Sequence, residues 1–293
     1  MPYLDSVNIE KFIDSLNVQL PPKEDFLQLS KIFPINPLYD LSPNFERGLL
    51  LYALISKFKP KNVLEIGTAE GFSTLCMAWA MTDCKIDGKI FTIDPKPFDH
   101  PIKRVVTWKE NQEHETVLLS TKDLWDKVAK NEWIKKIQVL TGFSGEILKK
   151  NSKTLPKMDM GFIDGHHDYK AVIHDFHAFL QIASENFCLL FDDYTPDGNG
   201  GVVQVINEEV VPNFDVTLLK TNPFDYPDKS NEHHDLQMCW IESSSLKQPL
   251  QEIFPKQKSN KIIKEYVNWE KRWKLRQSIN KKIPLLGKFR FNR

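Results

Sequence analysis

Three carboxylates stand at the ends of two apolar, β-branched segments, and their spacing predicts a divalent metal site. Asp164 ends the segment at 158–164, Asp192 ends the segment at 186–192, and Asp193 follows directly. Asp164 and Asp192 are 28 residues apart, the length of one strand–helix–strand crossover, so all three acids should meet at one sheet edge. Carboxylates that lie close together repel one another, which raises their pKa values, and a bound hard cation compensates this repulsion. Oxygen donors favour Mg²⁺, Mn²⁺ or Ca²⁺ over zinc. A role as helix caps is the alternative; it would explain any one of these acids but does not explain all three at this spacing.

A glycine-bearing turn earlier in the chain predicts a loop that approaches a ligand closely. The segment 63–73 reads as a strand that runs into a turn and then a helix. Gly67 and Gly71 let the backbone approach a ligand, and the helix N-terminus offers free N–H groups. Ala69 replaces the second glycine of the dinucleotide pattern, and Glu65 supplies a carboxylate that suits a cationic ligand. Both residues argue against an NAD-dependent oxidoreductase. The alternative is that this segment is an ordinary tight strand–helix turn that binds no ligand.

An acid ends the next apolar segment and strengthens this interpretation. Asp94 follows Gly67 by 27 residues, at the expected carboxyl end of the neighbouring strand. An acid at that position can accept hydrogen bonds from both hydroxyls of a ribose. The alternative is that Asp94 caps the N-terminus of a helix, but Pro95 and Pro97 make the start of a helix at this point less simple. The turn and Asp94 together favour an adenosine-containing cofactor.

These motifs lie within a regular alternation of predicted strands and helices. Strands are expected at 62–66, 89–94, 137–141, 158–164 and 186–192, and helices at 72–81, 144–151, 168–183 and 200–211. Such alternation implies a parallel sheet that is covered on both faces. Two later segments, 214–220 and 236–242, predict a closing antiparallel pair. The expected fold is therefore a doubly wound, seven-stranded, mostly parallel α/β sheet.

The segments outside this alternation divide the chain into three expected parts. Residues 1–60 form a helical N-terminal cover, residues 61–245 the main domain, and residues 246–293 a basic C-terminal helical extension. Within the main domain, residues 95–136 make a long connection with three tryptophans and a helical stretch near 117–134. Long connections in compact domains are usually functional, so this one is either a substrate lid or an ordinary two-helix insertion with its own small core.

The sequence resembles the class I S-adenosylmethionine-dependent methyltransferases, in the metal-dependent O-methyltransferase branch that includes catechol and macrolide-sugar enzymes. The resemblance covers about residues 40–242 and is strongest where the segment 42–48 leads to the strand and turn at 63–67. It implies that Glu65 lies near the methionine amino group, that Asp94 holds the ribose, and that the turn at 142–144 lines the adenine. The predicted cofactor-binding residues are Glu65, Gly67, Thr68, Gly71, Ser73, Asp94, Ser144 and Asp164.

The same resemblance implies a mechanism and a class of acceptor. The metal, taken as Mg²⁺ or another hard cation on Asp164, Asp192 and Asp193, would bind the acceptor's hydroxyl oxygen and hold it in line with the sulfonium methyl. Catechol-type relatives carry Asp-Asn at the final pair, so the two acids favour a sugar or small hydroxylated metabolite. His167 and Asp164 are the predicted catalytic residues. His167 stands where catechol-type relatives place a basic lysine, and its ordinary pKa near 6.5 allows it to accept a proton at pH 7; a structural histidine is the alternative.

The other histidines carry weaker signals. His174 and His177 have helical spacing but no further ligand at a matching distance, so they are interpreted as helix-surface or sheet-packing residues. The segment 232–235, with two more histidines, could reach the mouth of the pocket, although a solvated loop is the simpler interpretation.

The charge of the chain is balanced overall but not along its length. The 293 residues hold 39 basic and 39 acidic side chains, yet residues 256–293 carry a net charge of +11 and the rest −11. This distribution argues against a nucleic-acid partner for the catalytic domain. Four dispersed cysteines predict a reducing, cytoplasmic setting, and the sequence shows no export signal and no apolar segment long enough to cross a membrane.

The basic extension has a helical pattern of its own. Ile262, Tyr266, Trp269 and Trp273 repeat at helical spacing, with Lys and Arg on the other faces. Such a helix either docks on the acidic body or binds an anionic membrane surface or an acidic partner. The second function hypothesis is accordingly a non-catalytic adenosine-binding module that its tail recruits to such a surface. A homo-oligomer also stays open.

Overall fold

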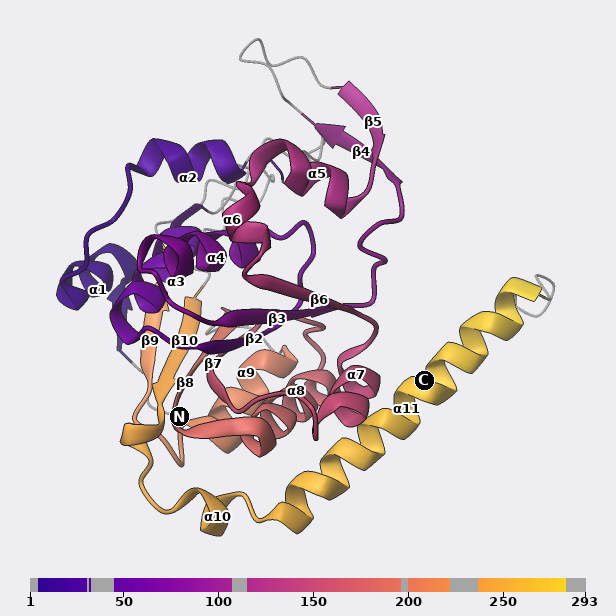
Figure 1. Cartoon of the computed structure of the whole chain (residues 1–293). Coiled ribbons are helices and arrows are strands. Elements are labelled where there is room, and N and C mark those ends of the chain that lie inside the picture. The colour runs from indigo at the N-terminus through magenta and orange to yellow at the C-terminus, as the bar shows by residue number, and fades with distance from the viewer. Residues whose placement is uncertain are drawn as a thin grey trace, which may run out of the picture.

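The computed structural model describes residues 5–30, 32, 45–106, 115–195, 200–221 and 237–282 (Figure 1). Its centre is an eight-stranded sheet in the order β1-β9-β10-β8-β7-β2-β3-β6. The strands are β1 (Ser6–Asn8), β2 (Asn62–Ile66), β3 (Lys89–Asp94), β6 (Ile137–Thr141), β7 (Met158–Ile163), β8 (Ala183–Tyr194), β9 (Thr217–Lys220) and β10 (Gln237–Glu242). β6, β3, β2, β7 and β8 are parallel, and β10 is antiparallel to β8 and β9. The predicted α/β fold with a mostly parallel sheet is confirmed.

The eighth strand comes from the segment expected to be only helical. β1 pairs in parallel with β9, with Val7 opposite Leu219. Three residues are too few to show the alternating pattern by which strands are predicted, which explains why the sequence indicated seven strands.

Helices cover both faces of the sheet (Figure 1). One face carries α1 (Ile9–Leu16), α2 (Lys23–Ser30), α3 (Phe45–Phe58), α4 (Phe72–Asp83), α5 (Thr121–Val128) and α6 (Asn131–Ile134); the other carries α7 (Ser144–Asn151), α8 (Tyr169–Ile182), α9 (Gly201–Val205) and the start of α11 (Lys256–Lys282). Successive residues of the central strands enter opposite cores: Val63 packs in the first and Leu64 in the second. This burial on both faces explains the continuous apolar strands of the sequence.

The connection at 95–136 contains a hairpin that its sequence pattern did not predict. β4 (Ile102–Val106) and β5 (Glu115–Leu119) are antiparallel and precede α5 and α6. Trp125 and Trp133 are buried in the core that covers the first face of the sheet, and Trp133 stacks on Trp79 at 5.1 Å. These two tryptophans therefore join the main core instead of forming a separate small one. Trp108 lies outside the described residues.

The long helix α11 follows the short α10 (Leu250–Ile253) and packs on α8 and α7. Tyr266, Val267 and Glu270 are buried in this contact. Figure 1 shows the C-terminal part of α11 extending beyond the body of the molecule. Among the described helices, none combines the length and apolar character needed to span a membrane.

Candidate functional site

The carboxyl ends of β2 and β7 approach each other so closely that only glycine fits between them. The backbone N–H of Asp164 donates to the carbonyl of Ile66 at 2.8 Å, which extends the parallel pairing into the loops. Gly67 has a φ of +103°, and a Cβ there would lie 1.9 Å from the carbonyl oxygen of Asp164. Both the left-handed backbone and the close approach require glycine at this position.

A cavity of about 600 Å³ opens over these strand ends. Four of the predicted cofactor residues line it: Gly67, Asp94, Ser144 and Asp164. The other four are buried and are not among the residues that line the cavity: Glu65, Thr68, Gly71 and Ser73. The structure thus brings half of the predicted set to the surface of one cavity and places the rest behind it.

Glu65 is a fully buried carboxylate within β2. Its Oε2 accepts hydrogen bonds from the hydroxyls of Thr74 and Thr92, and the Thr92 hydroxyl also contacts that of Thr68. Its Oε1 has no hydrogen-bond partner among the residues that the structure describes. Burial raises the pKa of Glu65 to about 8, although both threonine hydroxyls oppose the rise. A cationic partner would stabilise the ionised form of this acid.

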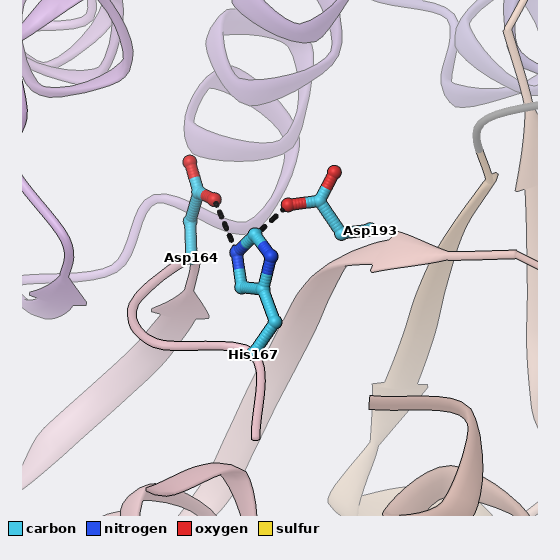
Figure 2. Close-up of side chains that lie close together, drawn as sticks. All are labelled: Asp164, His167 and Asp193. Carbon is cyan, nitrogen blue, oxygen red and sulfur yellow. Dashed lines mark ion pairs between the residues drawn. The ribbon is translucent and has the colours of Figure 1, made fainter. Parts of the chain in front are cut away.

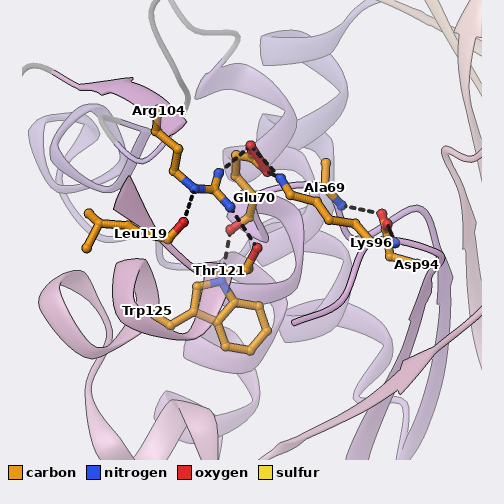
Figure 3. Close-up of polar contacts among 8 residues, drawn as sticks. All are labelled: Ala69, Glu70, Asp94, Lys96, Arg104, Leu119, Thr121 and Trp125. Atoms are coloured by element: carbon orange, nitrogen blue, oxygen red, sulfur yellow. Dashed lines mark hydrogen bonds and ion pairs between the residues drawn. The ribbon is translucent and has the colours of Figure 1, made fainter. Parts of the chain in front are cut away.

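Asp94 holds the turn that follows β2 (Figure 3). One carboxylate oxygen accepts a hydrogen bond from the backbone N–H of Ala69 at 2.8 Å, and the other accepts one from the backbone N–H of Lys96 at 2.7 Å. Ala69 has a φ of +47°, a left-handed conformation that glycine would adopt more easily. The predicted turn and the predicted acid are therefore in direct contact.

The same turn is fastened to the 95–136 connection by a buried ion pair that the sequence analysis missed (Figure 3). Arg104 of β4 contacts the carboxylate of Glu70 at 2.5 Å, and Lys96 contacts it at 2.7 Å. The indole N–H of Trp125 donates to the backbone carbonyl of Glu70 at 2.9 Å, and a Cβ on Gly71 would lie 2.4 Å from the Trp125 ring. Glu70 and Arg104 are 34 residues apart, so no local signal in the sequence marked their contact.

Asp164, His167 and Asp193 point toward one another at the ends of β7 and β8 (Figure 2). Nε2 of His167 lies 2.9 Å from Oδ2 of Asp193 and 3.9 Å from Oδ1 of Asp164, and one ligand atom from each residue lies within 4.8 Å of the others. Asp193 has a φ of +56°, and such strained backbone is typical of functional sites. The three residues could together hold a cation.

The remaining predicted metal ligand is paired with an arginine instead. Arg47 of α3 forms ion pairs with Asp192 and, at 3.0 Å, with Asp164. Burial raises the pKa of Asp192 to about 8, against the opposing effect of Arg47. The sequence analysis gave Arg47 no role, although it stands in the segment 42–48 that carried the family resemblance; residues 42–44 lie outside the described residues.

The electrostatics of His167 differ from the sequence expectation. The neighbouring carboxylates of Asp164 and Asp193 raise its pKa to about 10, against the effect of burial. For Asp193 burial opposes ionisation, but the hydrogen bond from His167 outweighs it and lowers the pKa. In this arrangement the His167 imidazole is protonated at pH 7, and its Nε2 donates to Asp193. To act as the predicted general base it would first have to lose this proton.

His174 and His177 also differ from expectation, because both are completely buried. His174 stacks on Tyr266 of α11 at 4.3 Å, and Nδ1 of His177 lies 2.9 Å from the hydroxyl of Ser259. α11 covers this face of α8, so of the two interpretations the helix-surface one was wrong. Both histidines are packing residues, although Tyr266 and Ser259 lie on a helix and not on the sheet. The segment 232–235 lies outside the described residues.

Comparison with known families agrees with this geometry. A family model described as a methyltransferase domain matches residues 64–194, from β2 to the end of β8. These residues form a methyltransferase domain. The resemblance to methyltransferases is therefore confirmed for this part of the chain.

The methyltransferase domain also has solved structural neighbours of low sequence identity. The O-methyltransferase TomG from Streptomyces achromogenes, involved in tomaymycin synthesis and solved with SAM, is 19% identical over 80% of this chain and 95% of its own, with a TM-score of 0.49. An O-methyltransferase from Bacillus cereus, solved with SAH, is 15% identical over 80% of this chain and 96% of its own, with a TM-score of 0.48. No curated protein sequence matches the chain.

Parts of the site lie outside the methyltransferase domain. Arg47 precedes it, and three cavity-lining side chains, Tyr266, Trp269 and Trp273, follow it on α11. The helical spacing of these aromatic residues was visible in the sequence, but their place beside the predicted cofactor residues was not.

Proposed function

We propose that the protein is an S-adenosylmethionine-dependent O-methyltransferase. The observation that carries this proposal is the cavity over the strand ends, which has Gly67, Asp94 and Ser144 on one side and the cluster of Asp164, His167 and Asp193 next to it. A cofactor in this cavity would lie beside groups that can bind and activate a hydroxyl. The methyltransferase domain at 64–194 supports the same reaction class.

Glu65 and Asp94 are proposed to recognise two different parts of the cofactor. The buried Oε1 of Glu65 is free to accept a hydrogen bond from the cofactor's ammonium group, and a cation there would favour the ionised carboxylate, whose burial otherwise raises its pKa. Asp94, which already organises the turn through Ala69, has the position and chemistry to accept hydrogen bonds from the ribose hydroxyls.

The proposal includes a divalent cation held by Asp164, His167 and Asp193. When bound, the cation would lower the pKa of the acceptor hydroxyl by Lewis acidity. Carboxylates suit Mg²⁺ and Mn²⁺ and imidazole suits zinc and iron, so the mixed donor set widens the choice beyond Mg²⁺. Asp192 and Arg47 would then position Asp164. The proposal assigns His167 to metal binding, for which the imidazole must lose the proton that the two acids hold on it at pH 7 when no cation is bound.

The acceptor is proposed to be a sugar or another small hydroxylated metabolite. The pair Asp192-Asp193, in place of the Asp-Asn of catechol-type enzymes, supports this choice. A cytoplasmic setting is part of the proposal because all four cysteines are free thiols.

Calorimetry with S-adenosylmethionine tests the cofactor assignment. The wild-type chain should bind in the micromolar range, and Glu65→Gln should weaken binding about tenfold or more because it removes a charge-assisted hydrogen bond. Glu185→Gln, at an exposed site, is the matched control and should bind like the wild type. A wild-type chain that does not bind the cofactor would refute the proposed function.

A methyl-transfer assay tests the metal separately. Sugars, nucleotide sugars and phenols are supplied with Mg²⁺ or Mn²⁺, and EDTA or Asp193→Ala should abolish turnover of the active acceptor. Full turnover in EDTA would remove the cation from the proposal and leave the cofactor assignment intact.

A second candidate function is a non-catalytic adenosine-binding module recruited by its tail. Lys271, Arg272 and Arg276 are exposed on α11, and this group of positive charges favours an acidic partner or an anionic membrane surface. Changing these three residues together to Gln should leave metal-dependent methyl transfer unchanged if the protein is an enzyme. Cofactor binding without turnover of any acceptor would instead support the module.

A further inference from the structure

Three aromatic side chains of α11 line the cavity that holds the predicted cofactor residues. Tyr266, Trp269 and Trp273 follow one another at helical spacing, so they share one face of the helix. Trp269 is partly buried and Trp273 is 39% exposed. Large aromatic rings that face a cavity and still have free surface can cover a flat ligand.

Specific contacts fix α11 at the start of α7. Within the described chain, α7 begins without a side-chain cap of its own, and the buried carboxylate of Glu270 lies close to its first turn. Burial raises the pKa of Glu270, and the backbone N–H groups of Gly145 and Glu146 oppose this rise. An acidic group at a helix N-terminus also interacts favourably with the helix dipole. Tyr266 hydrogen bonds to Ser144, and Lys274 forms an ion pair with Glu146.

The same contacts align the aromatic rings around the turn that precedes α7. Phe143 meets Trp273 edge to face at 5.4 Å, with an interplanar angle of 69°. Tyr266 stacks on Trp269 at 5.5 Å and 25°. The rings of α11 therefore form an aromatic wall (Tyr266, Trp269 and Trp273) opposite the strand ends. Its position is set by the packing of α11 on α7 and α8.

The position of this wall indicates which part of the cofactor it would meet. Asp94, the predicted ribose acid, is joined to the next turn by a hydrogen bond from the backbone N–H of Gly142 to the carbonyl of Asp94 at 2.8 Å. A group bound beyond Asp94 on the side of Gly142 would lie by Phe143 and the aromatic wall, which line the cavity, whereas the buried Glu65 does not line it. In an adenosine-containing cofactor that group is the flat adenine base.

We propose that Trp269 and Trp273 are cofactor-binding residues that cover the adenine of S-adenosylmethionine. This inference rests on the proposed function, because it takes the cofactor from there. It gives the basic extension a role in the cofactor site itself, as the side of the cavity opposite the turn at Gly67. Contact between an aromatic side chain and a nucleic-acid base contributes about tenfold to hundredfold in affinity.

The test is a titration of the full chain with S-adenosylhomocysteine, followed by calorimetry and by tryptophan fluorescence. The wild type should bind with a change in fluorescence. Trp269→Leu and Trp273→Leu should each bind about tenfold more weakly, and Trp269→Phe should recover most of the affinity because it keeps an aromatic face. Leu275→Ala, a 61% exposed position on the same helix, is the control and should bind like the wild type.

The outcomes separate this inference from the proposed function. If the wild type binds S-adenosylhomocysteine and both leucine variants bind equally well, the aromatic wall is only a packing surface and the inference is overturned, while the function stands. If the wild type does not bind, the proposed function fails and the inference falls with it. Thermal unfolding of each variant shows whether α11 remains docked, and a Leu variant that melts like the wild type but binds weakly supports the inference.

Discussion

A buried histidine predicts that the contact between α8 and α11 weakens in acid. His177 is fully buried, its Nδ1 contacts the hydroxyl of Ser259, and its Nε2 has no hydrogen-bond partner in the described part of the chain. Burial, and then the charges of Lys258 and His174, lower its pKa from 6.5 to about 4. Protonation would place an uncompensated charge inside the contact.

The sign and size of the effect follow from the two pKa values. The unfolded chain binds a proton at His177 below pH 6.5, whereas the folded chain does so only near pH 4. The contribution of His177 to stability is therefore complete above pH 6.5 and declines as the pH falls toward 4. Between pH 7.5 and 5.0 the free energy of unfolding should fall by about 2 kcal/mol on account of His177 alone.

Urea unfolding at pH 7.5 and 5.0 measures this change. His177→Asn keeps a polar group near Ser259 but does not titrate, so it should lose about 2 kcal/mol less than the wild type over the same interval. His100→Asn, at an exposed position, controls for the loss of a histidine and should behave like the wild type. If the wild type and His177→Asn lose equal stability, His177 titrates normally and the reasoning is refuted.

The remaining predictions concern the turn beside the cavity. Gly67→Ala should prevent stable folding or lower the melting temperature strongly, because its Cβ would lie 1.9 Å from the backbone of Asp164; Gly200→Ala, whose Cβ would meet no described atom within 4 Å, should melt almost normally. Arg104→Met should reduce the free energy of unfolding by about 3 kcal/mol, because Glu70 stays buried without its closest cation. Urea denaturation measures this loss, and an unchanged midpoint would show that Lys96 suffices for Glu70.

The sequence predicted those parts of the fold that repeat a pattern over several residues. Val63 and Leu64 face opposite cores, so their strand is apolar throughout and easily recognised. β1 and the β4–β5 hairpin could not be found in this way. β1 has only three residues, and the hairpin exposes the apolar Leu118 (65%), so its apolar residues do not mark a buried face.

The candidate site was predictable where its residues follow strands. Asp94, Asp164 and Asp193 each stand at a strand end, and parallel pairing alone brings such ends together. Arg47 could not be assigned to Asp164 because 117 residues separate them, and only the packing of α3 brings its guanidinium to the acids. The pKa of His167 could not be predicted from the sequence either, because it depends on which acids the folded chain brings to the imidazole.

The short strand β1 affects how the sheet meets other chains. Without it, β9 would present its outer N–H and C=O groups as a template for a strand from another molecule. β1 occupies that edge with only three residues, of which Val7 is 39% exposed, and so offers few groups for further pairing. Short edge strands of this kind oppose edge-to-edge aggregation. Resistance to aggregation at this edge therefore depends on a segment at the opposite end of the chain from the aromatic wall.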